Sequence, residues 1–162
     1  MSSSSSPTIP RFYRVFFSTI DPLIALSGAL TQLFAPATIL RLYNVSATAA
    51  ATTRPAPETT VLLDSGAGYL LSTMFLQVVL LRRRPADRTV WRCLEASILI
   101  QDVAVVGAVV RSLAAQHRLA WRLVAPDEWA NLAILVGLGA LRAAFLLGVG
   151  MGNAGEAKGK RT

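Results

Sequence analysis

Four long apolar stretches constrain this chain more than any other feature of its sequence. They cover approximately residues 15–34, 61–81, 93–110 and 129–151. A helix needs about 20 mostly apolar residues to cross the hydrocarbon core of a bilayer, and a lone segment in lipid must be helical because its backbone groups have no other partners. The sequence therefore predicts an all-α fold, a transmembrane four-helix bundle with short loops.

The composition agrees with a single membrane domain. Of the 162 residues, 53% are hydrophobic and 15% are charged, whereas about 25% are charged in ordinary soluble domains. We expect a disordered Ser-rich tail over residues 1–10, the four-helix domain over 11–152 and a basic disordered tail over 153–162. Cys93 is the only cysteine and His117 the only histidine, so the sequence predicts no disulfide and no metal site. We also expect no cofactor.

The basic residues predict the orientation of the spans, because Lys and Arg are enriched in the cytoplasmic loops of membrane proteins. The side that holds both termini and the second loop carries ten of them: Arg11, Arg14, Arg82, Arg83, Arg84, Arg88, Arg92, Lys158, Lys160 and Arg161. The other side carries five: Arg41, Arg54, Arg111, Arg118 and Arg122. We therefore expect both termini on the cytoplasmic side of the membrane. The expected membrane is that of the endoplasmic reticulum or another endomembrane. The sequon at Asn44 would then lie in a lumenal loop, where it could be glycosylated.

The same distribution of charge argues against nucleic acid as a partner. The basic residues lie mostly between apolar stretches and do not line a soluble face together with aromatic side chains. The expected partner is the lipid bilayer, and a lipophilic small molecule is a second candidate.

Charged side chains also occur inside the apolar stretches, where each costs about 2.5–3.5 kcal/mol on insertion scales. Asp102 follows Arg92 by ten residues and therefore lies about 15 Å deep. Helical spacing places Asn131 and Arg142 on one stripe of the fourth span. Depth makes Asp21 the most natural ion-pair partner of that arginine, and Asp102 is the other candidate. We expect a buried polar cluster of four residues: Asp21, Asp102, Asn131 and Arg142.

Several short motifs between residues 10 and 150 give the chain a resemblance to a known family. They are Pro10-Arg11, Phe16-Phe17, Ile20-Asp21-Pro22, Gly66, Tyr69-Leu70-Leu71, Asp102, Trp129-Ala130-Asn131, Arg142 and Phe145 to Gly150. With them the chain resembles a family of small fungal four-span membrane proteins classified as a domain of unknown function. The resemblance implies a membrane location and a fungal source, but no established activity. That family often has a His shortly after the third-span Asp, where this chain has Val105 and Val106, so a proton relay through such a His would be absent.

Two functions fit these residues directly, and a third, a transporter, would require the four spans to oligomerise around a path. In the first, the chain is an accessory or scaffold protein, and its buried charges fix the register of the helices. In the second, it is a membrane-embedded cyclase, isomerase or oxygenase that acts on a lipophilic secondary metabolite by acid catalysis. An acid shielded from water can hold and donate a proton, with Asp102 as the donor, Asp21 as the second acid and Arg142 as its partner. The sequence does not decide between an enzyme and a non-catalytic protein.

Overall fold

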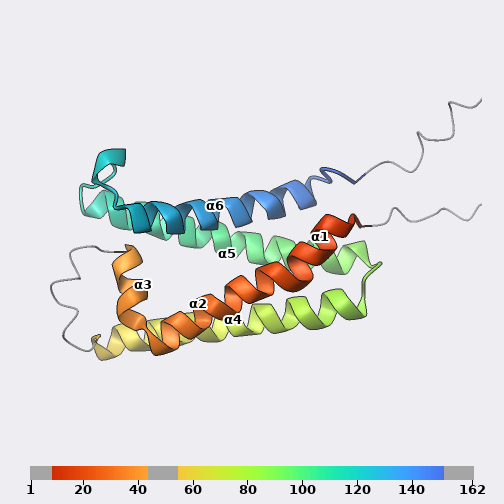
Figure 1. Cartoon of the computed structure of the whole chain (residues 1–162), viewed down its shortest axis with the longest axis horizontal. Coiled ribbons are helices and arrows are strands. Elements are labelled where there is room, and N and C mark those ends of the chain that lie inside the picture. The colour runs from red at the N-terminus through yellow and green to blue at the C-terminus, as the bar shows by residue number, and fades with distance from the viewer. Residues whose placement is uncertain (1–8, 44–54, 152–162) are drawn as a thin grey trace, which may run out of the picture.

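The computed structural model describes residues 9–43 and 55–151, which are almost entirely helical. The helices are α1 (Arg11–Val15), η1 (Phe16–Ile20), α2 (Asp21–Phe34), α3 (Pro36–Tyr43), α4 (Pro57–Arg83), α5 (Arg88–Ala115), η3 (Trp121–Leu123) and α6 (Pro126–Leu146). Helices α1, η1 and α2 follow one another without a break and form one rod (Figure 1). No strand occurs in these two ranges, and the prediction of an all-α helical bundle is confirmed.

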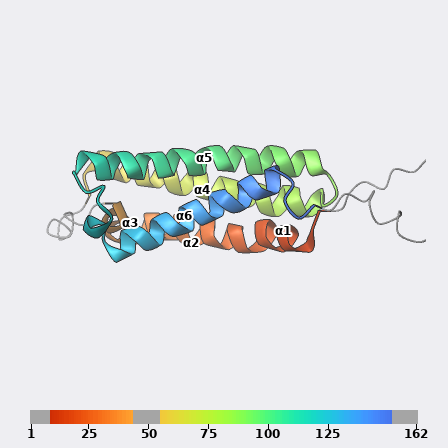
Figure 2. The ribbon, with the colours of Figure 1, turned by 90° about the horizontal axis from the view of Figure 1, so that it is seen from above.

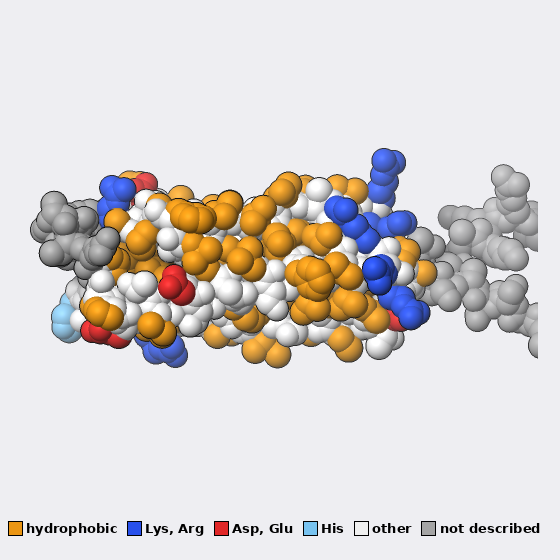
Figure 3. All heavy atoms as spheres, turned by 90° about the horizontal axis from the view of Figure 1, so that it is seen from below, with side chains coloured by type: hydrophobic (Ala, Val, Ile, Leu, Met, Phe, Trp, Pro, Cys, Tyr) orange, Lys and Arg blue, Asp and Glu red, His pale blue; other side chains and the backbone are white. Residues whose placement is uncertain are grey.

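Four rods are long and apolar enough to cross a membrane: Arg11–Phe34, Pro57–Arg83, Arg88–Ala115 and Pro126–Leu146. Hydrophobic side chains cover much of the middle of the face seen in Figure 3, and most of the visible Lys and Arg side chains gather toward its right end. An apolar belt bounded by basic residues is the surface of a multi-pass membrane protein.

The four rods lie side by side, and the short helix α3 crosses one end of the bundle (Figures 1 and 2). Helix α2 packs along α4, helix α5 packs along α6, and α3 extends from α2 to contact α6. The start of α1 and the end of α6 lie together at the end opposite α3 (Figure 1). There the hydroxyl of Tyr13 donates a hydrogen bond to the carbonyl of Val149 at 2.9 Å.

The observed helices do not end where the apolar stretches end. Helix α4 starts at Pro57 rather than at residue 61, and α5 starts at Arg88 rather than at residue 93. Polar residues continue these helices beyond the apolar part, and the carboxylate of Asp87 caps α5 by accepting hydrogen bonds from two backbone amides. Helix α6 was predicted to run to Met151 but ends at Leu146, because Gly148 adopts a φ of +80° that ends a right-handed helix.

An ion pair links the loop between α5 and α6 to the start of α6, at the end of the bundle near α3. The guanidinium of Arg118, in the loop between α5 and α6, donates to both carboxylate oxygens of Glu128 at 3.0 and 2.7 Å. Glu128 also accepts a hydrogen bond from the amide of Ala125 and so caps α6. The Gln116 side chain donates to the carbonyl of Tyr43 at 3.5 Å, which links this loop to the end of α3.

At the opposite end, each rod contributes one side chain to a closed layer that we call the apolar layer. Its members are at most 1% exposed: Phe17, Leu81, Trp91 and Phe145. The ring of Phe145 packs edge-on against that of Phe17 with centroids 5.5 Å apart, and its centroid lies 6.1 Å from that of Trp91. The apolar layer therefore closes the interior of the bundle on the side of the two chain ends.

Candidate functional site

Beyond the apolar layer, each rod contributes one polar side chain to a second layer, which we call the polar layer. Its members are at most 4% exposed: Asp21, Gln77, Glu95 and Arg142. Each member lies three or four positions along its helix from a member of the apolar layer, so the two share a helix face. The pairs are Phe17 with Asp21, Leu81 with Gln77, Trp91 with Glu95, and Phe145 with Arg142.

Arg142 is the centre of the polar layer. Its Nη2 donates to both carboxylate oxygens of Asp21, at 2.8 and 2.6 Å, and its Nη1 donates to Oδ2 of Asp102. Its Nε lies 3.3 Å from Oε2 of Glu95. Asp21 also accepts a hydrogen bond from the Gln77 amide. The guanidinium thus joins α6 to α2 and α5, and Gln77 brings in α4.

Three carboxylates surround this single guanidinium. Within the described part of the chain, neither oxygen of the Glu95 carboxylate accepts a hydrogen bond, although the side chain is fully buried. A buried charge is stable only when an opposite charge or a proton balances it. The site therefore requires protons or a cationic group in addition to Arg142. No group of three or more His, Cys, Asp or Glu side chains in residues 9–43 and 55–151 is placed to hold a metal ion.

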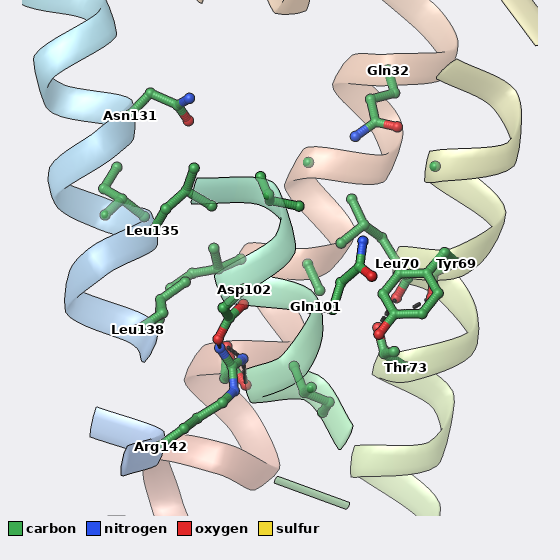
Figure 4. A pocket seen from close by; sticks show the side chains of 18 of the residues that line it. Gln32, Tyr69, Leu70, Thr73, Gln101, Asp102, Asn131, Leu135, Leu138 and Arg142 are labelled. Atoms are coloured by element: carbon green, nitrogen blue, oxygen red, sulfur yellow. Dashed lines mark hydrogen bonds and ion pairs between the residues drawn. The ribbon is translucent and has the colours of Figure 1, made fainter. Parts of the chain in front are cut away.

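A cavity of about 280 Å³ begins at the polar layer and lies among the four rods and α3. Most of its wall is apolar, and Figure 4 shows Leu135 and Leu138 of α6 on one side and Leu70 of α4 on another. Ile39 and Tyr43 of α3 also line it. This volume is near the lower end of the usual range for small-molecule sites, about 300–1,000 Å³.

Several polar groups in this cavity have no partner among the residues that the structure describes. The carboxylate of Asp102 is bonded only through Oδ2, so its Oδ1 accepts no hydrogen bond there. The side chains of Tyr69, Gln101 and Asn131 line the same space (Figure 4) and likewise form no side-chain hydrogen bond within the two described ranges. The amide nitrogen of Asn131 is fully buried, and buried polar groups are nearly always hydrogen-bonded in folded proteins. These groups are therefore placed to bind water or a ligand.

The structure brings together three of the four residues expected to cluster: Asp21, Asp102 and Arg142 are in direct contact. Asn131 is not part of this cluster. It lies on the predicted stripe of α6 but eleven residues from Arg142, about 16 Å at 1.5 Å per residue. Asn131 thus shares a face of α6 with Arg142, but its distance along the helix keeps it out of the cluster. The sequon at Asn44 falls outside the described residues.

Two members of the polar layer were missing from the expected cluster. Glu95 precedes Asp102 by seven residues and therefore shares its helix face, a signal that could have added it. Gln77 carries no comparable signal, because an uncharged polar residue in an apolar stretch can face either a neighbouring helix or the membrane surface. Only the packing of α4 against α2 shows that it contacts Asp21.

Comparison with known protein families shows the family of this chain. A family model described as Domain of unknown function (DUF7704) matches residues 6–152, a range that contains all four rods and both layers. No curated protein and no solved structure matches the chain.

Proposed function

We propose that this chain, which belongs to the family described as Domain of unknown function (DUF7704), binds a lipophilic small molecule in the cavity between its membrane helices. One observation carries the proposal. Polar side chains without partners face a mostly apolar cavity that starts at a buried charged cluster. Leaving such groups unpaired is costly in a medium of low dielectric constant, so a bound molecule that pairs with them is favoured.

The surroundings of the cavity support a lipophilic occupant. All five helices that line the cavity belong to the apolar bundle, and the rods expose large hydrophobic side chains such as Phe34, Ile100 and Val103 on their outer surfaces. A molecule dissolved in the membrane is therefore close to the cavity. Its apolar part gains contact with side chains such as Leu135, and its polar part gains the hydrogen bonds that hydrocarbon cannot provide.

In the simplest form of this function the chain is an accessory protein that holds a metabolite for another protein. The polar layer then has a structural task, because the contacts of Arg142 fix the positions of the helices around the cavity. No chemical step is required. A fungal source and a place among the enzymes of secondary metabolism belong to this proposal.

A second candidate is an acid-catalysed isomerase or cyclase, and the free Oδ1 of Asp102 favours it. A proton on this oxygen would pass to an alkene carbon or an epoxide oxygen of the ligand, leaving a carbocation on the ligand. The carbocation would then lose a proton from a neighbouring carbon to the Asp102 carboxylate. The reaction is a net isomerisation, and the carboxyl group returns to its starting state without a co-reactant. Arg142 would stabilise the carboxylate that forms on Asp102, and the carboxylate of Asp21 would stabilise the carbocation.

A matched pair of valine variants on α5 tests the binding function. Val105 lines the cavity, whereas Val103 is 65% exposed on the outer surface of the same helix. We expect the purified wild-type protein to retain a lipophile that mass spectrometry detects after extraction. Val105→Trp fills the cavity and should lose that molecule, while Val103→Trp should keep it. Retention by both variants, or no molecule in the wild type, would contradict the proposal.

Asp102→Asn distinguishes the two forms of the function. If the chain is an isomerase, the wild-type protein converts the extracted lipophile into a product of equal mass and different chromatographic retention, and the variant does not. If the chain is an accessory protein, neither protein changes the molecule. Membrane insertion of the variant, measured by extraction and size-exclusion chromatography, shows that the comparison is between folded proteins.

The orientation of the chain is also part of the proposal. The end of the bundle with the apolar layer also carries Arg82, Arg83, Arg84, Arg88 and Arg92, and basic residues favour the cytoplasmic side. Both termini would then be cytoplasmic, and α3 would face the lumen of an endomembrane.

A further inference from the structure

The balance of charge at the polar layer indicates what kind of molecule the cavity takes. Building on the proposed function, we infer that the occupant is an elongated lipophile whose polar end is neutral or cationic, a hydroxyl or an amine. Carboxylates and phosphates are rejected. The argument rests on the contacts of one guanidinium, on the number of acids around it and on one free carboxylate oxygen.

The guanidinium of Arg142 is already occupied. Both oxygens of Asp21 bind its Nη2, Asp102 binds its Nη1, and Glu95 lies beside its Nε. Arginine recognises an anionic ligand by presenting two parallel N–H groups to it. Its Nη1 and Nη2 are bonded to Asp102 and Asp21, and its Nε, which donates no hydrogen bond among the described residues, faces Glu95, so no parallel pair of N–H groups is left for a ligand.

The acids outnumber the bases at this site. Three carboxylates contact Arg142, and it is the only Lys, Arg or His among the described residues that line the cavity. An anionic ligand would add a further negative charge where low dielectric screens it poorly. An ammonium group would instead reduce the surplus, and a hydroxyl group would leave it unchanged.

Asp102 offers the acceptor that such a ligand needs. Its side chain is 14% exposed, compared with 3% for that of Asp21, so it is the acid that opens onto the cavity. Its Oδ1 has no hydrogen-bond partner among the residues that the structure describes and can accept a hydrogen bond from an amine or a hydroxyl. The side chains of Tyr69 and Gln101 line the same part of the cavity (Figure 4) and can form further hydrogen bonds with such a hydroxyl or amine.

The shape of the cavity limits the rest of the ligand. Arg142 and Asn131 both line it, and these residues lie eleven positions apart on α6, about 16 Å along the helix axis. A cavity of about 280 Å³ that extends over this distance is narrow. The occupant therefore has an extended apolar body, with its polar end at Asp102 and its other end toward Asn131 and α3.

Three photoreactive probes test this inference on the full-length protein in nanodiscs of zwitterionic lipid. They share one diazirine-bearing alkyl chain and end in an amine, an alcohol or a carboxylate. We expect the amine and the alcohol to label α6 between residues 131 and 142, and the carboxylate to label it at least about tenfold less. Equal or stronger labelling by the carboxylate would overturn the inference and leave the proposed function intact. No labelling of the cavity by any probe would count against both.

Variants and competition complete the test. Asp102→Asn should reduce labelling by the amine probe and should bring the extent of that labelling closer to the labelling by the carboxylate probe. Asp64→Asn should change neither, because Asp64 is exposed on α4 and does not line the cavity. If Asp102→Asn does not fold, competition on the wild-type protein gives the same information. An unlabelled alkylamine should displace the alcohol probe at lower concentration than the matching alkyl carboxylate, and the reverse order would refute the inference.

Discussion

Arg142 is the residue on which the polar contacts of the bundle converge. It is 4% exposed and contacts acids from α2 and α5. Removing one partner of a buried ion pair costs about 3–5 kcal/mol, because it leaves an unbalanced charge in a medium of low dielectric constant. Here three carboxylates would lose their common partner.

Arg142→Gln should therefore lower the free energy of unfolding by about 3–5 kcal/mol. Detergent-induced unfolding in mixed micelles measures this change. Arg83→Gln is the matched control, because Arg83 is exposed and forms no ion pair within the described ranges. The control should stay within about 0.5 kcal/mol of the wild type. If Arg142→Gln behaves like the control, the polar layer does not hold the helices together.

His117 is strained in a way that one substitution can relieve. It follows the C-terminus of α5 with a φ of +54°, and the amide of the next residue donates to the Leu113 carbonyl at 2.9 Å. This is the left-handed position that commonly ends a helix and that favours glycine. A left-handed residue with a Cβ costs about 1–2 kcal/mol.

His117→Gly should thus raise the free energy of unfolding by about 1 kcal/mol. His117→Ala is the control at the same position, because alanine keeps the Cβ and should give no gain. Thermal unfolding of the three proteins in one detergent makes the comparison. A gain of equal size with alanine would show that the imidazole, and not the backbone, is the source of the strain.

At the scale of the helices, the first rod contains a π-helical segment, η1, which ends two residues before Pro22. Proline has no N–H to donate to the preceding turn, so a backbone carbonyl in that turn needs another donor. The guanidinium of Arg82 on α4 donates to the carbonyl of Ser18 at 3.2 Å. Asp21, the residue between η1 and the proline, contacts Arg142 from this segment.

Arg82→Ala should cost about 1 kcal/mol of stability, the usual net value of one hydrogen bond. In a Pro22→Ala background the backbone N–H is restored, and the same change should cost less. The double-mutant cycle of these two substitutions, measured by detergent-induced unfolding, gives the difference directly. Additive effects would show that Arg82 does not compensate for the proline.

The helices also show why the sequence predicts some structural features, such as the four rods, and not others, such as the helix ends. Apolar stretches predict the four rods because burial in lipid requires a minimum length of apolar helix. They do not predict the helix ends: Asp87 caps α5 outside the apolar stretch, and Gly148 ends α6 inside it. Asp21 and Arg142 could be paired from their depth alone. The contact of Gln77 with Asp21 depends on which faces of α2 and α4 meet, and neither helix encodes that by itself.

At the scale of the whole molecule, the proposed orientation gives a direct test. The turn between α4 and α5 is exposed at Ala86, and the loop between α5 and α6 is exposed at Leu119. A glycosylation tag inserted at Leu119 should be modified in microsomal membranes, and the same tag at Ala86 should not. A gel shift measures both, and modification at Ala86 alone would show that the bundle is inverted.

The apolar layer determines with which leaflet of the bilayer a molecule bound in the cavity can exchange. Phe17, Leu81, Trp91 and Phe145 leave almost no exposed surface where the four rods meet, so nothing held beside Arg142 can leave past them without repacking a core. A molecule in the cavity would then exchange with one leaflet only, the leaflet beside α3. The bundle would store the bound molecule for that leaflet and would not transfer it to the other. Any difference in lipid composition between the two leaflets would therefore be preserved.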